Sequence, residues 1–196
     1  MARICKSILI VMALAALASC GIFFAPMDGR WNPDDPKSEL QRFDPVVSGY
    51  VHNVAPTWVD TGSLLAYPGS KIILLRFDTD DFPNVVANSY LRLTVQDPPS
   101  YDAELSIYRM TSDSDPKTLI YTELDRKPAL LYDDSKVSKF TISYGLGEQV
   151  QIPLTEVYSG KKEDLANGIL IFSSENIGFY PTGDQINEPV LLVEPE

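Results

Sequence analysis

The chain has 196 residues, of which 27 are acidic and 16 are Lys or Arg, so its formal net charge is −11. Such an acidic protein repels phosphate backbones, and we therefore expect no nucleic acid among its partners. The chain contains 2 Cys and 1 His, too few for a zinc site of Cys and His ligands or for a disulfide framework. We expect one globular domain of ordinary size, without a metal or another cofactor.

The first 19 residues have the pattern of a secretory signal peptide. Arg3 and Lys6 precede an apolar stretch, residues 8–18, which is shorter than the roughly 20 residues of a membrane-spanning helix. The stretch ends in Leu17-Ala18-Ser19-Cys20. This pattern resembles a bacterial lipobox, and the resemblance implies that the signal is removed before Cys20 and that Cys20 is acylated. The alternative is a soluble secreted protein in which Cys20 is unmodified.

Cleavage before Cys20 would also change the charge and the thiol chemistry of the chain. It removes Arg3 and Lys6 but no acidic residue, so the mature chain is still more acidic. Cys5 leaves with the signal and Cys20 becomes a thioether, which leaves the domain without a free thiol. Gly21 follows Cys20, whereas Asp at that place favours inner-membrane retention in similar enterobacterial lipoproteins. We therefore expect an envelope protein of the outer membrane or cell surface.

Residues 20–53 are expected to form a tether between the acylated Cys20 and the folded domain. The prolines of this stretch are Pro26, Pro33, Pro36 and Pro45. Proline fixes φ and lacks a backbone donor, so an extended and irregular chain is favoured over a helix. The folded domain is then expected to comprise residues 54–196.

The pattern of residues 54–196 predicts an all-β domain, an antiparallel β-sandwich. Short runs of β-formers are separated by Pro, Gly, Asp and Asn at spacings typical of a sandwich. Residues 71–77 are a continuous apolar run, which is typical of a central strand buried on both faces. Residues 91–95, 103–107 and 150–152 alternate between apolar and polar, as half-buried strands do. At most one short helix is expected, near residues 155–166, with Thr155 as its N-cap.

Six short segments, spread in order along the domain, resemble the DNRLRE-type family. They are DTGSLL (60–65), LLRFD (74–78), SYLRL (89–93), VQIPLTEV (150–157), NGILI (167–171) and PVLLV (189–193). That family, related to carbohydrate-binding modules, occurs in bacterial secreted and surface proteins. The resemblance implies a jelly-roll β-sandwich.

Patterns that would support catalysis or metal binding are weak in this sequence. The segment Asp78-Thr79-Asp80-Asp81 offers oxygen ligands for Ca²⁺, but it departs from an EF-hand loop, and we favour a polar turn after a strand. His52 is the single histidine and no G-x-S-x-G motif accompanies it, so serine catalysis lacks its signature. We expect a protein that is not an enzyme.

Three tyrosines in predicted loops are the candidate ligand-binding residues. They are Tyr101, Tyr132 and Tyr180, and loops are where sandwich domains carry function. Exposed aromatic rings suit the apolar faces of sugars, whereas Trp58 lies in a predicted strand and is expected in the core.

Two functions from different classes follow from these observations. The first is a surface-anchored, non-catalytic binding domain with a glycan as its expected ligand. The second is a structural or protein-interaction lipoprotein of the cell envelope without a small-molecule ligand. In both, the membrane is a partner through the lipid on Cys20, and in the second the other partner is an envelope protein.

Overall fold

The computed structural model describes residues 40–195 except 56, 84, 120, 122–130, 144, 155 and 158–162. The chain divides into two units, residues 1–37 and residues 38–196. The predicted signal peptide, Cys20 and most of the predicted tether lie outside the described residues. In the part that is described, no helix is long and apolar enough to cross a membrane.

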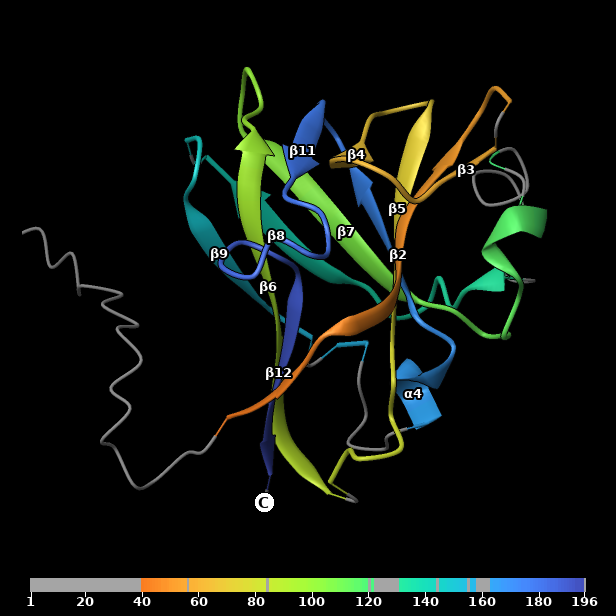
Figure 1. The fold of residues 1–196 in the computed structure, drawn as a ribbon, viewed down its shortest axis with the longest axis vertical. Helices are drawn as coiled ribbons and strands as arrows, with labels where there is room; N and C mark the ends of the chain where they lie inside the picture. The colour runs from red at the N-terminus through yellow and green to blue at the C-terminus, as the bar shows by residue number, and fades with distance from the viewer. Residues whose placement is uncertain are drawn as a thin grey trace, which may run out of the picture. The chain divides into compact units, whose positions relative to one another are not determined.

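The described strands form two six-stranded antiparallel sheets (Figure 1). The first sheet contains β1 (Gln41–Phe43), β4 (Leu64–Ala66), β6 (Val86–Asp97), β9 (Gln149–Pro153), β11 (Ile177–Phe179) and β12 (Val190–Pro195). The second contains, in spatial order, β3 (Trp58–Val59), β2 (Pro45–His52), β5 (Lys71–Phe77), β10 (Ile169–Ser173), β7 (Ala103–Arg109) and β8 (Ser138–Ile142). Strands β12 and β11 follow one another along one side of β6, and β9 pairs with its other side.

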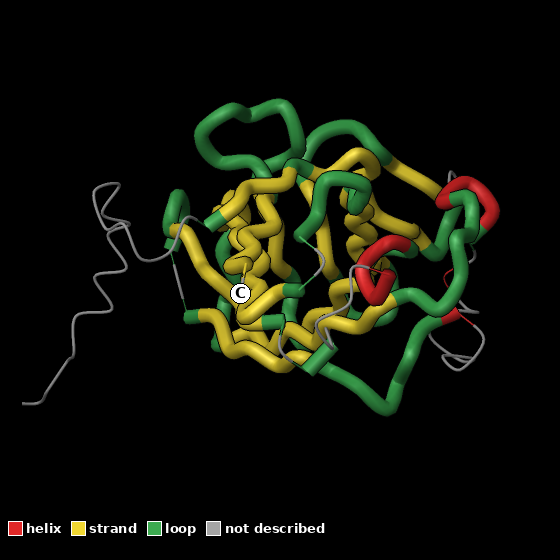
Figure 2. The backbone as a smooth tube through the Cα atoms, turned by 90° about the horizontal axis from the view of Figure 1, so that it is seen from below, coloured by secondary structure: helices red, strands yellow, loops and turns green. Residues whose placement is uncertain are grey.

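The order of the strands is that of a jelly roll. Four strands of the first sheet, β1-β12-β6-β9, face four of the second, β5-β10-β7-β8. From β5 onward the chain changes sheet at each step from one of these strands to the next, except at β7 and β8, which are neighbours in one sheet. This alternation characterises the jelly roll. The prediction of an all-β, jelly-roll-like sandwich is thus confirmed, and Figure 2 shows the strands filling the centre of the domain.

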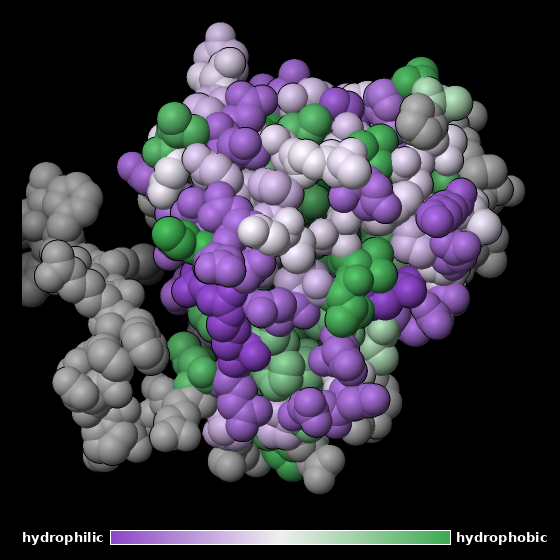
Figure 3. All heavy atoms as spheres, in the orientation of Figure 1, coloured by the Kyte–Doolittle hydropathy of each residue, from purple (hydrophilic) through white to green (hydrophobic). Residues whose placement is uncertain are grey.

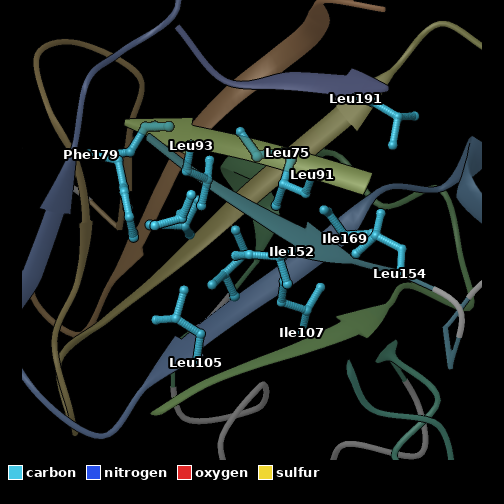
Figure 4. Close-up of a cluster of buried hydrophobic side chains, with 14 of the residues drawn as sticks. Leu75, Leu91, Leu93, Leu105, Ile107, Ile152, Leu154, Ile169, Phe179 and Leu191 are labelled. Carbon is cyan, nitrogen blue, oxygen red and sulfur yellow. The ribbon is translucent and has the colours of Figure 1, made fainter. Parts of the chain in front are cut away.

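The main core lies between the two sheets. Leu91 and Leu93 of β6 and Ile152 of β9 meet Leu105 and Ile107 of β7, and all five are fully buried. Figure 4 shows side chains from both sheets in this cluster. The alternation predicted for these three strands is confirmed, because each strand sends every second side chain to this core.

A second hydrophobic cluster lies on the outer face of the second sheet. Ile72 and Leu74 of β5 pack there with Leu119 and Tyr121, which belong to the connection between β7 and β8. Ile73 and Leu75, the alternate residues of β5, belong to the main core. Strand β5 is therefore buried on both faces, as its continuous apolar run predicts.

The start of the sandwich requires a correction to the predicted domain boundary. We expected the tether to continue to Asn53, but β1 and β2 already lie in the sheets: β1 pairs with β12, and β2 pairs with β5 from Pro45 to His52. Pro45 is the first residue of its strand, a position that tolerates proline. The folded domain thus begins near Gln41, because the backbone pairing of β2 outweighs the local preference of proline for irregular chain.

Helices α4 and η1 accompany the strands in the part of the chain that the structure describes. Helix α4 (Glu163–Ala166) falls within the predicted range of 155–166, whereas the expected N-cap, Thr155, lies outside the described residues. The 3₁₀-helix η1 (Pro116–Thr118) lies in the connection between β7 and β8, and the carboxylate of Asp115 accepts a hydrogen bond from the backbone N–H of Lys117.

Candidate functional site

The three predicted ligand tyrosines do not come together. Tyr101 is 76% exposed in the loop between β6 and β7, and Tyr180 is half-buried after β11, where its backbone N–H donates to the carbonyl of Thr94. Tyr132 forms a bridge with Met110, beyond the far end of β7, and β7 alone is roughly 20 Å long. Tyr132 is moreover buried, with 6% exposure, which corrects its expected place as an exposed loop aromatic.

Tyr132 nevertheless lies in a cluster of three aromatic rings on the outer face of the second sheet. Its ring centroid is 4.8 Å from that of Tyr108 on β7 and 5.6 Å from that of Phe172 on β10, and Tyr108 and Phe172 meet edge to face at 5.5 Å. The strand period places Tyr108 and Phe172 here, because the alternate residues Ile107 and Ile171 point into the main core. Such edge-to-face and tilted contacts are favourable between aromatic rings.

Polar groups surround these rings and form a shallow hollow of about 310 Å³, which we call the aromatic hollow. It is lined by Glu104, Ser106, Tyr108, Tyr132, Phe172, Ser173 and Ser174. Lys139 of β8 donates to Oε1 of Glu104 at 2.8 Å, and the backbone N–H of Glu104 donates to Oγ of Ser174 at 2.9 Å. The hydrogen bond to Glu104 and the charge of its carboxylate raise the pKa of Lys139. The hollow thus combines aromatic surface with hydroxyl groups and a carboxylate, and the ammonium group of Lys139 is bonded to that carboxylate.

A second hollow, the Trp58 groove, lies where β2 and β3 meet η1. It has a volume of about 340 Å³ and is lined by Pro45, Val46, Val47, Ser48, Trp58, Asp60, Asp115, Pro116, Lys117 and Thr182. We predicted Trp58 to be a core residue, and it does contact the outer hydrophobic cluster. It is only half-buried, however, because β3 is a two-residue strand at the edge of its sheet. Sequence reasoning missed this groove, since Lys117 and Thr182 are distant from Trp58 along the chain.

The acidic segment after β5 forms a turn. The backbone N–H of Asp80 donates to Oδ1 of Asp78 at 3.0 Å, and the N–H of Phe82 donates to the carbonyl of Thr79 at 3.1 Å. This is the polar turn that we favoured over a calcium loop. Among the described residues, no three His, Cys, Asp or Glu side chains are grouped so that they could hold a metal ion.

Comparison of the chain with known protein families and with curated proteins finds no match. The resemblances to a lipobox and to the DNRLRE-type family therefore stay predictions that rest on the residues quoted for them. The jelly roll and the two hollows are observations of the structure itself.

Proposed function

We propose that this protein is a lipid-anchored bacterial envelope protein whose β-sandwich is a non-catalytic domain that binds glycans. Acylation of Cys20 would attach it to the outer membrane or cell surface. The lipobox pattern at Leu17-Ala18-Ser19-Cys20 supports the anchor, because two or more acyl chains give stable membrane attachment whereas one does not.

The observation that carries the glycan proposal is the aromatic hollow. A sugar ring has apolar C–H faces and a hydroxyl-bearing edge, so it needs an aromatic surface and hydrogen-bonding groups side by side. Tyr108 and Phe172 are half-buried and offer such a surface, and Glu104 and Ser106 line the same hollow. Convergence of aromatic and polar groups in one concavity is typical of ligand sites.

The lining of the aromatic hollow supports binding rather than catalysis. A glycosidase uses two carboxyl groups that flank the bond to be cleaved, whereas Glu104 is the one acidic residue among the described residues that line the hollow. Oε1 of Glu104 accepts a hydrogen bond from the ammonium group of Lys139 at 2.8 Å. A carboxylate has several acceptor positions, so Glu104 can accept further hydrogen bonds from sugar hydroxyls.

A panel of oligosaccharides, including peptidoglycan fragments, tests the glycan proposal with the full-length protein in detergent. We expect at least one saccharide to bind and the variants Phe172→Ala and Tyr108→Ala to weaken it about tenfold, as loss of roughly 1.4 kcal/mol of aromatic contact would do. The matched control is Tyr101→Ala, which removes an exposed tyrosine elsewhere. Circular dichroism confirms that each variant is folded. Unchanged binding in both hollow variants, or a panel without binding, would overturn the proposal.

The anchor is tested separately by mass spectrometry and cell fractionation. The purified protein should begin at Cys20 and carry the mass of its acyl groups. The variant Cys20→Ala should leave the membrane fraction, because the hydrophobic attachment is gone. An unmodified Cys20, or membrane attachment of the variant equal to that of the natural chain, would contradict the anchor.

Two neighbouring loops favour protein docking as a second candidate function. Tyr101 and Leu146 are 76% and 66% exposed, and their loops are joined by a 2.6 Å hydrogen bond from Ser143 to Asp102. Exposed aromatic side chains are common anchors of protein interfaces. On the face drawn in Figure 3, by contrast, hydrophobic residues lie in separate groups among hydrophilic ones, as on ordinary protein surfaces. A photo-crosslinking side chain at position 101 should trap one defined envelope protein in cells if these loops dock a partner.

A further inference from the structure

The Trp58 groove has an aromatic wall that the backbone of β2 supports. A Cβ atom built on Gly49 would lie 2.7 Å from Cζ2 and Cη2 of Trp58, so the six-membered ring of the indole rests directly on the backbone of Gly49. The half-buried indole thus packs against β2 on one side while part of its surface lines the groove. A rigid aromatic side chain in a fixed position loses little entropy when a ligand stacks on it.

Polar groups from separate parts of the chain surround that wall. Asp60 follows β3, Asp115 and Lys117 belong to η1 and its cap, and Thr182 follows β11. The hydroxyl groups of Ser48 and Thr182 are hydrogen-bonded at 2.6 Å, which holds the Thr182 loop against β2. Because the Asp115 carboxylate accepts from the backbone N–H of Lys117, the cap also fixes the start of η1. Carboxylate, ammonium and hydroxyl groups thus accompany an aromatic ring, the same chemistry as in the aromatic hollow.

The two hollows are separate from one another on the second sheet. Trp58 lies on β3 and Phe172 on β10, three strands away in the sheet, which corresponds to roughly 14 Å at the usual strand spacing. Both residues pack against the outer hydrophobic cluster, whose buried members include Val51 of β2, Leu74 of β5 and Leu170 of β10. A single sugar ring cannot occupy both hollows, but a saccharide polymer can reach both.

We propose that the Trp58 groove is a second saccharide-binding site, so that the domain holds a polysaccharide at two points. This inference rests on the proposed glycan function. Once one site holds a polymer, binding of a further part of the same chain at the second site becomes intramolecular. The affinity for a long saccharide then exceeds that for a short one by about a hundredfold or more, provided that the chain can span the two sites.

Trp58 itself provides the readout. The chain has 2 tryptophans, so the substitution Trp31→Phe leaves Trp58 as the only one. The short oligosaccharide that binds most tightly in the panel is titrated into this full-length variant in detergent. We expect calorimetry to give two sites and the fluorescence of Trp58 to change on binding, because a sugar stacked on the indole replaces water there.

Variants at the rim test the site without disturbing the packing of Trp58. Asp60→Asn and Lys117→Ala change exposed side chains, so the fold should be retained. The variant that carries both substitutions should show no fluorescence change and only one binding site. Its affinity for a long polymer of the same saccharide should be at least tenfold lower than that of the natural chain. Asp81→Asn, an exposed acid in the turn after β5, is the control and should leave all three readouts unchanged.

The possible failures are distinguishable. If a saccharide binds at one site only and the fluorescence of Trp58 stays constant, the inference is overturned while the glycan function of the aromatic hollow stands. If Phe172→Ala removes all binding, including the response of Trp58, the two sites are not independent and the inference also falls. If no saccharide binds, both the proposed glycan function and the second saccharide-binding site are overturned.

Discussion

The missing side chain at Gly49 determines where Trp58 lies. Gly49 is in the middle of β2. Glycine is usually unfavourable in a strand because it loses more backbone entropy on folding than other residues and contributes no side chain to packing. Here any Cβ would meet the carbonyl oxygen of Val59 and the indole of Trp58. The lack of a side chain at Gly49 therefore leaves room for the indole of Trp58, which lies on the neighbouring strand β3.

We expect Gly49→Ala to destabilise the domain by about 1–3 kcal/mol, the usual range for overpacking. Strand β3 or the indole must move to admit the new methyl group, so the Trp58 groove should change with it. Chemical denaturation measures the loss. Gly145→Ala is the matched control, because a Cβ there meets only Oε1 of Glu148 at 3.9 Å. Equal stability of the two variants would show that the contact with Trp58 is loose.

Asp133 provides a pH-dependent contribution to stability. The hydroxyl of Ser135 donates to its carboxylate and Arg109 pairs with it, and these interactions hold the pKa of Asp133 below its ordinary value although burial acts in the opposite direction. A carboxyl whose pKa is lowered by folding stabilises the folded state above its unfolded pKa, and this contribution is lost as the pH falls through the folded pKa.

We therefore expect Ser135→Ala to lower the free energy of unfolding by about 1 kcal/mol at neutral pH. Protonation of Asp133 removes the charge that strengthens this hydrogen bond, so the difference from the natural chain should shrink once the pH falls below the ordinary value of about 3.9. Urea denaturation from neutral pH down to acid measures both quantities. A difference that is the same at all pH values would contradict the role of the ionised carboxylate.

At the scale of elements, the strands differ in how many of their faces are buried. Strand β9 alternates, with Gln151 exposed and Val150 and Ile152 buried, whereas β5 buries four successive residues. The difference arises because the connection between β7 and β8 covers the outer face of the second sheet above β5. One strand therefore contributes to two hydrophobic clusters.

We expect Leu74→Ala in the outer cluster to destabilise the domain about as much as Leu75→Ala in the main core, by roughly 2–5 kcal/mol each. Both side chains are fully buried, so both substitutions lose apolar contacts and leave a cavity. Gln151→Ala, on the exposed face of β9, should change stability by less than about 0.5 kcal/mol. Thermal and chemical denaturation test this. A small effect of Leu74→Ala alone would show that the outer cluster contributes little.

At the scale of the whole molecule, the first described strands join both sheets. Strand β1 pairs with β12 at the edge of the first sheet, and β2 pairs with β5 and β3 in the second. Residues 41–52, which the sequence assigns to the tether, are therefore part of the sandwich. Any pull on the chain upstream of Gln41 would act on β1 first, and Arg42 ties this strand to Glu188 through a 2.6 Å ion pair.

We expect a chain that begins at residue 38 to fold and one that begins at residue 54 to fail. The shorter chain lacks β1 and β2, which leaves β5 paired with β10 alone and places Ile72 and Ile73 at a new sheet edge. Circular dichroism and thermal denaturation of both fragments decide this. A cooperative unfolding transition of the shorter fragment, with the midpoint of the longer one, would restore the boundary predicted at residue 54.

The sequence by itself determined the class of fold and much of the main core. Apolar alternation at 91–95 and 150–152 and the apolar run at 71–77 are local patterns, and local patterns identify which face of a strand is buried. The same local patterns predict a domain start that is too late, because proline favours irregular chain whereas the pairing of β2 with β5 is a contact between distant parts of the chain. The signal peptide and the acylation of Cys20 are also inferred from local sequence patterns, and both stay predictions.

Only the tertiary structure decided which side chains share a site. Tyr108, Tyr132 and Phe172 belong to different segments, and the pairing of β10 with β7 brings two of them together. Tyr132 is buried where it packs against Tyr108 of β7 and Phe172 of β10, which its loop-like sequence does not show, while the short edge strand β3 leaves Trp58 partly open. The physical reason is that a residue's exposure depends on what the rest of the chain places over it. Residue types and their period describe only a few neighbouring residues of the chain. A hollow is formed by segments that meet only when the sheets assemble.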